Sequence, residues 1–285
     1  MTLKLAVPNK GRLNERSVEL LIKSGLDLGE DWGRKLYVTV KDQDIEVMFV
    51  RAQDIPEFVD SGAVDIGITG IDQVLESGYH LEYLLDLEFG YCRLSVAVPE
   101  ASGIKSVDDI PDGSRVATSF PNSAKRFFDS KKKKKMKIVE VSGAAEIMPY
   151  MGVSDLIVDL VSSGSTLKTN RLIEISRIAE SQAVVVSKKK KNSKEVTDVV
   201  DAIRSVIAAE SRKYLMADVP KDCLKKVQEL FPGMAGPTVM NIAGRDDMVA
   251  IHVVIESSDV YDSVNELKRL GAKGILTLPI DRLVP

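Results

Sequence analysis

Short apolar segments of strand length alternate with segments of helical spacing through most of this chain of 285 residues. Strands joined by helices in this order predict an α/β layer with a largely parallel sheet, and no other feature of the sequence limits the fold as strongly. Before residue 92, the expected strands are 3–7, 36–40, 45–50 and 64–69, and the expected helices are 12–24, 55–61 and 71–76.

The same alternation starts again after Arg93. The expected strands there are 94–98, 115–118, 138–141 and 156–159, with helices near 122–130 and 144–151 and a return path through 173–178 and 183–187. This pattern predicts two similar α/β lobes that are joined by crossing segments near 91–95 and 180–188. A cleft between two such lobes, at the carboxyl ends of the strands, is a natural ligand site.

The last part of the chain has a different order of elements. A long helical pattern with one apolar stripe covers 194–213. Strands at 214–219, 238–242, 248–255 and 274–278 and helices at 221–230 and 259–270 then follow as βαββαβ, with a turn at 244–247. That order is typical of ferredoxin-like domains. We therefore expect a first lobe of residues 1–91 and 181–212, a second lobe of 92–180, and a C-terminal domain of 213–285.

Charge and cysteine content exclude several functional classes. The formal net charge of −3 argues against a protein that binds nucleic acid through bulk positive charge. The two cysteines and two histidines are widely spaced, which argues against a disulfide framework and a structural zinc site. The N-terminal segment has no signal-peptide cleavage site, and no apolar run is long enough to cross a bilayer. We expect a cytoplasmic protein without nucleic-acid or membrane partners.

Residues 154–170, SDLIVDLVSSGSTLKTN, combine a buried strand with a turn of small hydroxyl residues at 162–166. Such a turn presents backbone N–H groups and hydroxyls to one small volume, which suits a phosphate group. Asp155 and Asp159 would meet ribose hydroxyls or a hydrated magnesium ion. The alternative is an ordinary N-capping turn between a strand and a helix.

Several segments together resemble the long form of ATP phosphoribosyltransferase, the first enzyme of histidine biosynthesis. The similar segments are LAVPNKGRL (5–13), FVRAQDIPEFVDSGAVDIGITGIDQVLE (49–76), CRLSVAVP (92–99), RVATSFPNSAKRFF (115–128), SGAAEIMPYMGVSDLIVDLVSSGSTLKTN (142–170), GPTVMNI (236–242) and LGAKGILTLPIDRL (270–283). The resemblance covers essentially the whole chain. It implies an α/β fold: a two-lobed catalytic part similar to type II periplasmic binding proteins, followed by a ferredoxin-like βαββαβ regulatory domain.

The resemblance also implies a reaction. N1 of ATP attacks the anomeric carbon of phosphoribosyl pyrophosphate, pyrophosphate leaves, and Mg²⁺ is required. In this family the loop that matches 162–166 holds the 5′-phosphate of the donor. The donor-binding residues implied here are Ser162, Ser163, Gly164, Ser165 and Thr166, with Glu146 nearby. By the same match, Asp155 and Asp159 lie beside the ribose as catalytic residues and metal ligands.

Glycosyl transfer of this kind aligns two large anions and stabilises a leaving pyrophosphate, so positive side chains are expected at the site. Arg12 is the catalytic candidate, and the ATP-binding candidates are Lys10, Arg16, Arg51, Asp72, Tyr91 and Arg93, with Arg126 as a weaker one. Lys10, Arg12 and Arg51 stand out because each follows a buried strand directly. The alternative for each of these charges is an ordinary place on the surface.

In the long form, the C-terminal domain binds L-histidine as a feedback inhibitor and builds hexamers from dimers. The positions that match histidine-contacting places are Asp218, Thr238, Val254 and Thr277. The alternatives are structural: Thr238 begins a strand, Val254 lies in the core, and His252 is a packed or interface histidine.

Two departures from the family pattern concern loops. Lysine runs at 131–135 and 188–191 replace mixed sequences; they are either solvated basic loops or a basic rim that steers polyphosphates. Arg171 takes a position that is often Gly, where Gly would serve a helix end. We therefore expect the helix before Arg171 to close differently.

Two other functions remain open from the residues. A two-lobed small-molecule binding protein would share the lobes, although such proteins usually carry an export signal and need no regulatory domain. A phosphoribosyltransferase with another acceptor would share the phosphate loop. The segments NKGRL and VRAQDIPEF favour the family that uses ATP.

Overall fold

The computed structural model describes residues 2–131, 135–188, 193–232 and 236–284. Its contacts divide the chain into two compact units, Met1–Ile22 with Leu26–Val200, and Lys23–Gly25 with Asp201–Pro285. Most of both lysine runs, 131–135 and 188–191, lies outside the described residues. No helix in these ranges has the length and apolar character needed to cross a bilayer.

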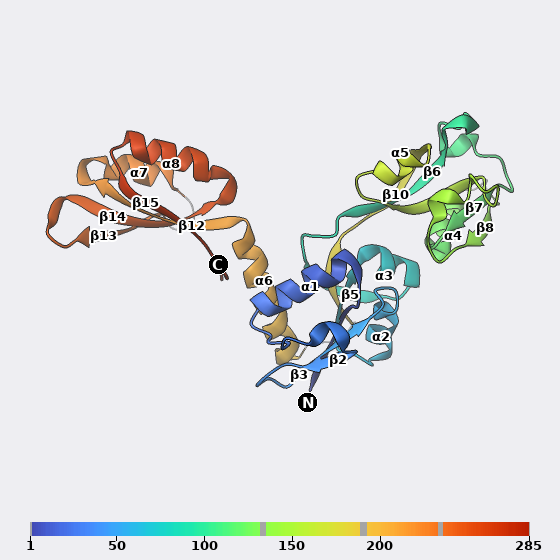
Figure 1. Cartoon of the computed structure of the whole chain (residues 1–285), viewed down its shortest axis with the longest axis horizontal. Helices are drawn as coiled ribbons and strands as arrows, with labels where there is room; N and C mark the ends of the chain where they lie inside the picture. The colour runs from blue at the N-terminus through green and yellow to red at the C-terminus, as the bar shows by residue number, and fades with distance from the viewer. Residues whose placement is uncertain (1, 132–134, 189–192, 233–235, 285) are drawn as a thin grey trace. The chain divides into compact units, whose positions relative to one another are not determined.

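The first unit contains two sheets, one in each lobe. The sheet of the first lobe has the strand order β2-β3-β1-β4-β11-β5, and Figure 1 labels β2, β3 and β5 of this sheet. Its strands are β1 (Leu3–Pro8), β2 (Tyr37–Thr39), β3 (Ile45–Val50), β4 (Ile66–Gly70), β5 (Leu81–Asp86) and β11 (Ala183–Lys188), and its helices are α1 (Gly11–Lys23), α2 (Ile55–Ser61) and α3 (Ile71–Ser77). Val59 of α2 and Val74 of α3 pack with Ala6 and Val184 of the sheet in one buried cluster.

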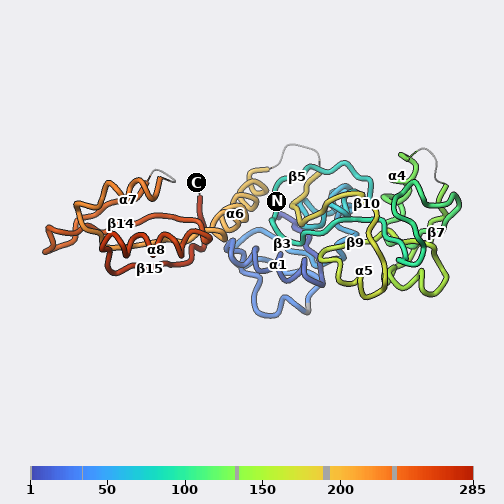
Figure 2. Tube along the Cα trace, turned by 90° about the horizontal axis from the view of Figure 1, so that it is seen from above, coloured from blue at the N-terminus to red at the C-terminus, as the bar shows by residue number. Residues whose placement is uncertain are grey.

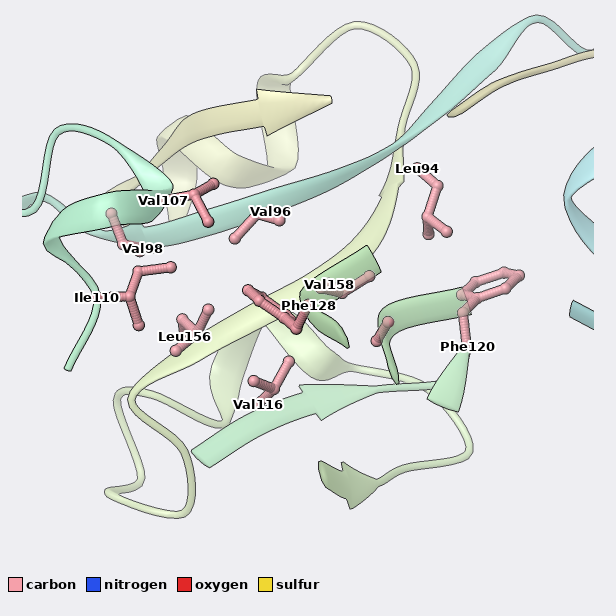
Figure 3. Close-up of a cluster of buried hydrophobic side chains, with 11 residues drawn as sticks. Leu94, Val96, Val98, Val107, Ile110, Val116, Phe120, Phe128, Leu156 and Val158 are labelled. Atoms are coloured by element: carbon pink, nitrogen blue, oxygen red, sulfur yellow. The ribbon is translucent and has the colours of Figure 1, made fainter. Parts of the chain in front are cut away.

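The sheet of the second lobe has the order β10-β6-β9-β7-β8. Its strands are β6 (Cys92–Pro99), β7 (Arg115–Thr118), β8 (Lys137–Glu140), β9 (Leu156–Val161) and β10 (Leu172–Ser181), and its helices are α4 (Pro121–Ser130) and α5 (Ser165–Thr169). Phe128 of α4 packs against Leu156 and Val158 of β9 (Figure 3). A second cluster joins Ile157 of β9 to Leu167 of α5. Alternate residues of β9 therefore face α4 and α5.

Apart from β2, which pairs antiparallel with β3 at one edge of the first sheet, the two sheets have the same mixed order. β1 pairs in parallel with β3 and β4, and β7 pairs in parallel with β8 and β9. β11 and β6, the strands that cross from the other lobe, pair antiparallel with both neighbours. The expected largely parallel sheet is therefore wrong, because each crossing strand enters in the opposite direction. Two α/β lobes linked by crossing strands confirm the expected two-lobed architecture.

Two elements differ from the expectation. The helix expected at 144–151 is only one 3-10 turn, Ala145–Ile147, and the chain turns again where Gly152 N donates to the Pro149 carbonyl at 3.1 Å. Pro149 has no N–H to donate within a helix, although Met148 before it keeps helical backbone angles. Strand β5 was not expected, because LEYLLD contains no β-branched residue; its pairing with β11 overrides that local preference.

The second unit is a four-stranded antiparallel sheet with the order β13-β14-β12-β15. Its strands are β12 (Arg212–Pro220), β13 (Thr238–Ile242), β14 (Arg245–Glu256) and β15 (Lys273–Pro279), and its helices are α7 (Leu224–Leu230) and α8 (Val260–Arg269). Val227 of α7 and Leu267 of α8 pack with Leu215 and Ile251 of the sheet. α8 runs alongside β15 in both views (Figures 1 and 2). This arrangement confirms the ferredoxin-like domain.

Helix α6 (Lys194–Glu210) contributes to both units, since the division falls between Val200 and Asp201. The sequence pattern placed the boundary after residue 212. The end of α6 belongs with the second unit because Leu283 N donates to the Ser205 carbonyl at 2.8 Å.

Candidate active site

A cavity of about 460 Å³ lies beside the loop that follows β9. Residues of both lobes line it: Arg12, Glu146, Asp159, Leu160, Val161, Ser162, Ser163, Gly164, Ser165, Thr166 and Leu167. All five hydroxyl-loop residues expected at 162–166 are therefore brought together, and Arg12 of the first lobe and Glu146 face the same space.

The loop is shaped by hydroxyl contacts and one left-handed residue. Gly164 has φ of +77°, a conformation that glycine adopts without strain, and α5 begins at the next residue. The hydroxyls of Ser163 and Ser165 lie 3.0 Å apart, and Ser165 N donates to Ser163 Oγ at 3.4 Å. The first amide groups of a helix have no carbonyl partner within it. The turn therefore presents N–H donors and hydroxyls to an anion in the cavity.

Asp159 faces the cavity because of its position on β9. It lies between Ile157 and Val161, which point towards α5 and the turn that contains Glu146. Burial raises the pKa of Asp159 and the nearby Glu146 carboxylate raises it further, whereas the hydrogen bond from Leu160 N, 2.8 Å long, opposes the shift. Burial makes the ionised form of this carboxylate less favourable, and positive charge on a bound ligand would reduce that cost.

Asp155 does not line this cavity, so the structure does not bring the expected pair of aspartates together there. Asp155 immediately precedes β9, about 13 Å from Asp159 for four residues of extended chain. Its carboxylate accepts hydrogen bonds from Arg115 N at 2.8 Å and from Arg115 Nη2 at 2.7 Å. The Arg115 guanidinium lowers the pKa of Asp155. A spacing of four residues along extended chain keeps the two carboxylates too far apart to share one ligand.

Lys10, Arg12 and Arg51 follow the C-terminal ends of two neighbouring strands of the first sheet, β1 and β3. β1 and β3 run in parallel, with Pro8 aligned to Val50, and Asn9 N donates to the Val50 carbonyl at 2.7 Å. The chain segments that carry the three cations therefore leave the sheet together. Arg12 alone among them lines the cavity, and all three are exposed.

Arg16 and Asp72, expected to bind ATP, have other contacts. Arg16 Nη1 donates to Glu19 Oε2 on the same helix at 2.6 Å. Asp72 is buried, with its carboxylate accepting from Ser181 Oγ at 2.6 Å and from Gln73 Nε2 at 2.6 Å. Burial raises the pKa of Asp72. In this conformation Arg16 is therefore engaged within α1, and Asp72 is bonded to the end of β10.

Arg93 supports the loop from behind. Its Nε donates to Glu174 Oε1 at 2.8 Å, and its Nη1 donates to the Ser162 carbonyl at 3.0 Å. Glu174 also accepts from Ser95 Oγ at 2.8 Å. Sequence reasoning missed Glu174, because only the antiparallel pairing of β6 with β10 brings it to Arg93.

Tyr91 lies next to Arg93 on a second, smaller cavity of about 300 Å³. The tyrosine is 63% exposed, and Ser162 lines both cavities. An exposed aromatic ring of this kind offers a surface for a base or sugar.

Three of the four expected effector residues share one face of the second sheet. Asp218 pairs with Ala250 and Thr238 pairs with His252, which places both on the face away from the helices, together with Val254. His252 is hydrogen-bonded to the Tyr214 hydroxyl. Thr277 pairs with Leu215, a core residue, and so belongs to the opposite face. A bulge in β15 between the partners of Met216 and Asp218 hides this difference from a count along the sequence.

Family models match both parts of the chain. The model of ATP phosphoribosyltransferase (HisG) matches residues 51–207, and the model of the HisG C-terminal domain matches residues 209–282.

Curated relatives match over nearly their full length. The ATP phosphoribosyltransferase of Methanocaldococcus jannaschii is 44% identical over 99% of this chain and 100% of its own length, and that of Methanopyrus kandleri is 45% identical over 99% and 100%. A chain of the ATP phosphoribosyl transferase (HisG:HisZ) complex from Thermotoga maritima superposes with a TM-score of 0.66 at 32% identity, covering 73% of this chain and 99% of that chain. The chain therefore belongs to the ATP phosphoribosyltransferase family, in its long form with the C-terminal domain.

Proposed function

We propose that the cavity beside loop 162–166 binds phosphoribosyl pyrophosphate, and that the chain transfers its phosphoribosyl group to N1 of ATP with release of pyrophosphate. One observation carries this placement. A turn rich in amides and hydroxyls, a half-buried carboxylate and an arginine from the other lobe share a single space of about 460 Å³. A donor with a phosphate at one end, a ribose ring and a pyrophosphate at the other matches that order of groups.

The 5′-phosphate of the donor lies in the turn, where the amides at the start of α5 and the hydroxyls of Ser163, Ser165 and Thr166 donate to it. This contact fixes the ribose beside Asp159. As the bond to pyrophosphate lengthens, positive charge develops on the ribose ring, and the Asp159 carboxylate stabilises it. Because burial raises the pKa of Asp159, the developing charge relieves a carboxylate that the protein holds unfavourably.

Arg12 faces the leaving pyrophosphate from the first lobe. A guanidinium presents a planar fork of donors that suits phosphate oxygens, and it stays charged throughout the reaction. Its place at the start of α1, one residue after Gly11, aims it across the cavity from a rigid helix.

Magnesium fits the acidic side of the cavity. Mg²⁺ usually binds through one or two carboxylates, water and substrate phosphates, and Asp159 and Glu146 provide the carboxylates here. Among the described residues, no group of three or more His, Cys, Asp or Glu side chains forms a metal site. When bound, the ion supplies neutralisation of the pyrophosphate charge.

ATP approaches from the C-terminal ends of β1 and β3, which Lys10 and Arg51 follow. Those two cations face the triphosphate, and Tyr91 offers its exposed ring to the adenine. Arg93 holds the Ser162 carbonyl and so keeps the donor loop in place beside the nucleotide.

The C-terminal domain binds L-histidine on the helix-free face of its sheet, through Asp218, Thr238 and Val254, and lowers the activity. The protein works in the cytoplasm as a homo-oligomer, which forms dimers and hexamers. The histidine site is supported by the fold, which brings Asp218, Thr238 and Val254 onto one face of the sheet.

The test is product formation. Purified protein is mixed with ATP, phosphoribosyl pyrophosphate and Mg²⁺, and phosphoribosyl-ATP is followed by near-ultraviolet absorbance and identified by mass spectrometry. We expect product that requires all three components and that L-histidine suppresses. Binding of both ligands without product would instead indicate a two-lobed binding protein, and product with another nucleotide but not ATP would indicate a different acceptor.

A further inference from the structure

The end of α3 in the first lobe contacts the start of α4 in the second lobe. Glu76 Oε1 accepts a hydrogen bond from Asn122 N at 2.8 Å, and Glu76 Oε2 accepts one from Ser123 N at 2.9 Å. Asn122 Nδ2 donates to the Glu76 carbonyl at 3.2 Å. α4 has no side-chain cap of its own, since Phe120 occupies its N-cap position. A carboxylate from the other lobe therefore caps this helix.

Arg126 of α4 makes the reciprocal contact. Its Nη2 donates to the carbonyl of Leu75, which lies in the last turn of α3, and to Ser123 Oγ. Carbonyls in a last helical turn lack partners within the helix and attract cations, as amides in a first turn attract anions. The Glu76 carboxylate meets the first turn of α4 and the Arg126 guanidinium meets the last turn of α3, so each charge faces the end of the other helix that favours it, and two contacts hold the helix ends together.

The start of α3 is also bonded to the segment that crosses between the lobes. Asp72 N donates to Ser181 Oγ at 3.0 Å, and Ser181 Oγ donates to Asp72 Oδ1 at 2.6 Å. Ser181 is the last residue of β10, a strand of the second sheet. α3 has seven residues, so it spans about 10 Å between these two contacts.

We propose that α3 is an interlobe strut, and that Glu76 and Arg126 are positioning residues that hold the lobes at the angle required for phosphoribosyl transfer. Two crossing segments alone would allow the lobes to rotate about them, as in hinge-bending proteins. The cavity depends on that angle, because Arg12 comes from one lobe and loop 162–166 from the other. The link between lobe angle and phosphoribosyl transfer rests on the proposed function, whereas the claim that α3 holds the lobes at one angle does not.

Interlobe distance provides the first test. Nitroxide labels at Glu57→Cys and Lys137→Cys, two exposed positions on different lobes, are measured by double electron–electron resonance in the full chain with Cys92→Ser and Cys223→Ser. Glu76→Gln keeps the shape but loses one acceptor oxygen and the charge. We expect it to broaden the distance distribution, and phosphoribosyl pyrophosphate with ATP to narrow it again. Glu82→Gln, an exposed carboxylate of β5 in the same lobe, is the control that leaves the distribution unchanged.

Steady-state kinetics provides the second test. If the strut sets the population of the competent angle, Glu76→Gln raises KM for the donor about tenfold and leaves kcat nearly unchanged at saturation. Arg126→Ala behaves in the same way, and Arg126→Lys, which keeps a donor for the Leu75 carbonyl, recovers most of the wild-type KM. A merely stabilising role would lower the melting temperature without this split between KM and kcat.

Two results overturn the proposal. Unchanged distance distributions in both Glu76→Gln and Arg126→Ala exclude the strut, whatever the activity. A broadened distribution with wild-type KM excludes the positioning role. A wild-type protein that makes no phosphoribosyl-ATP contradicts the proposed function instead, and the distance measurement then decides on the strut by itself.

Discussion

The same substitution at Asp155 and at Asp159 should have different consequences. Asp159 lies on β9 and Asp155 immediately precedes that strand, four residues away or about 13 Å along extended chain. Asp159 lines the cavity, whereas Asp155 is paired with Arg115. We expect Asp159→Asn to lower turnover and Asp155→Asn to lower stability only.

The magnitude for Asp159 comes from electrostatic stabilisation of the ribose cation. Removal of one such group costs on the order of 10²-fold in kcat, and at least about tenfold where other groups compensate. Stability should not fall. Burial raises the pKa of Asp159 in the folded protein, so the stability that this group contributes is full below the unfolded-state pKa and is lost as pH rises through the folded pKa. Asparagine cannot ionise, so the variant is at least as stable at neutral pH.

The sign for Asp155 is the reverse. Arg115 lowers the pKa of Asp155, so its contribution is present above the unfolded-state pKa and disappears as pH falls through the folded pKa. The two side chains are 42% and 46% exposed, so screening limits the loss in Asp155→Asn to at most about 1 kcal/mol. The loss should vanish in acid.

The assay compares kcat with the free energy of unfolding in urea for the wild type and both variants, at neutral and acidic pH. Equal turnover losses at both positions would refute the assignment of the cavity side of β9. Normal turnover in Asp159→Asn would remove that residue from the reaction.

Three further predictions follow from the loop, the end of α5 and the second sheet. Gly164→Val should abolish donor binding in calorimetry, because valine does not readily adopt the φ of +77° found there and the loop would change its backbone conformation. A steric clash is not the cause, since a Cβ at this position would meet only Val161 Cγ1, at 3.9 Å. Unchanged affinity contradicts the phosphate placement. Arg171 has φ of +53°, so Arg171→Gly should raise the free energy of unfolding by about 0.5–1 kcal/mol, and a decrease would show that the arginine side chain has a stabilising contact. Thr238→Ala should weaken histidine inhibition more than catalysis, whereas equal loss of both would make that residue structural.

Local patterns predicted the elements that end at distinctive residues. α2 and α3 end at Gly62 and Gly78, both left-handed, and the predicted ranges match these helices within one residue. The closure of α5 shows the limit of such reasoning: Arg171 takes the left-handed conformation that glycine usually provides, so the expected different closure is wrong in geometry.

Properties that depend on pairing between distant strands were beyond a single sequence. The sequence does not show that β6 and β11 run antiparallel to their neighbours. The contact of Arg93 with Glu174 depends on that pairing, and the face that Thr277 occupies depends on the register of β15. The loop at 162–166 could be predicted because its chemistry is contiguous, whereas the Glu76 contact with α4 joins residues 46 apart in the sequence.

Hydrogen–deuterium exchange of the wild-type protein with phosphoribosyl pyrophosphate and Mg²⁺ tests the central claim most directly. Main-chain amides just after Asp159 are the proposed anchor of the donor, so peptides covering 159–168 should gain the largest protection, and Gly164→Val should remove that gain. Protection confined to other segments, with this stretch exchanging at its ligand-free rate, would contradict the account.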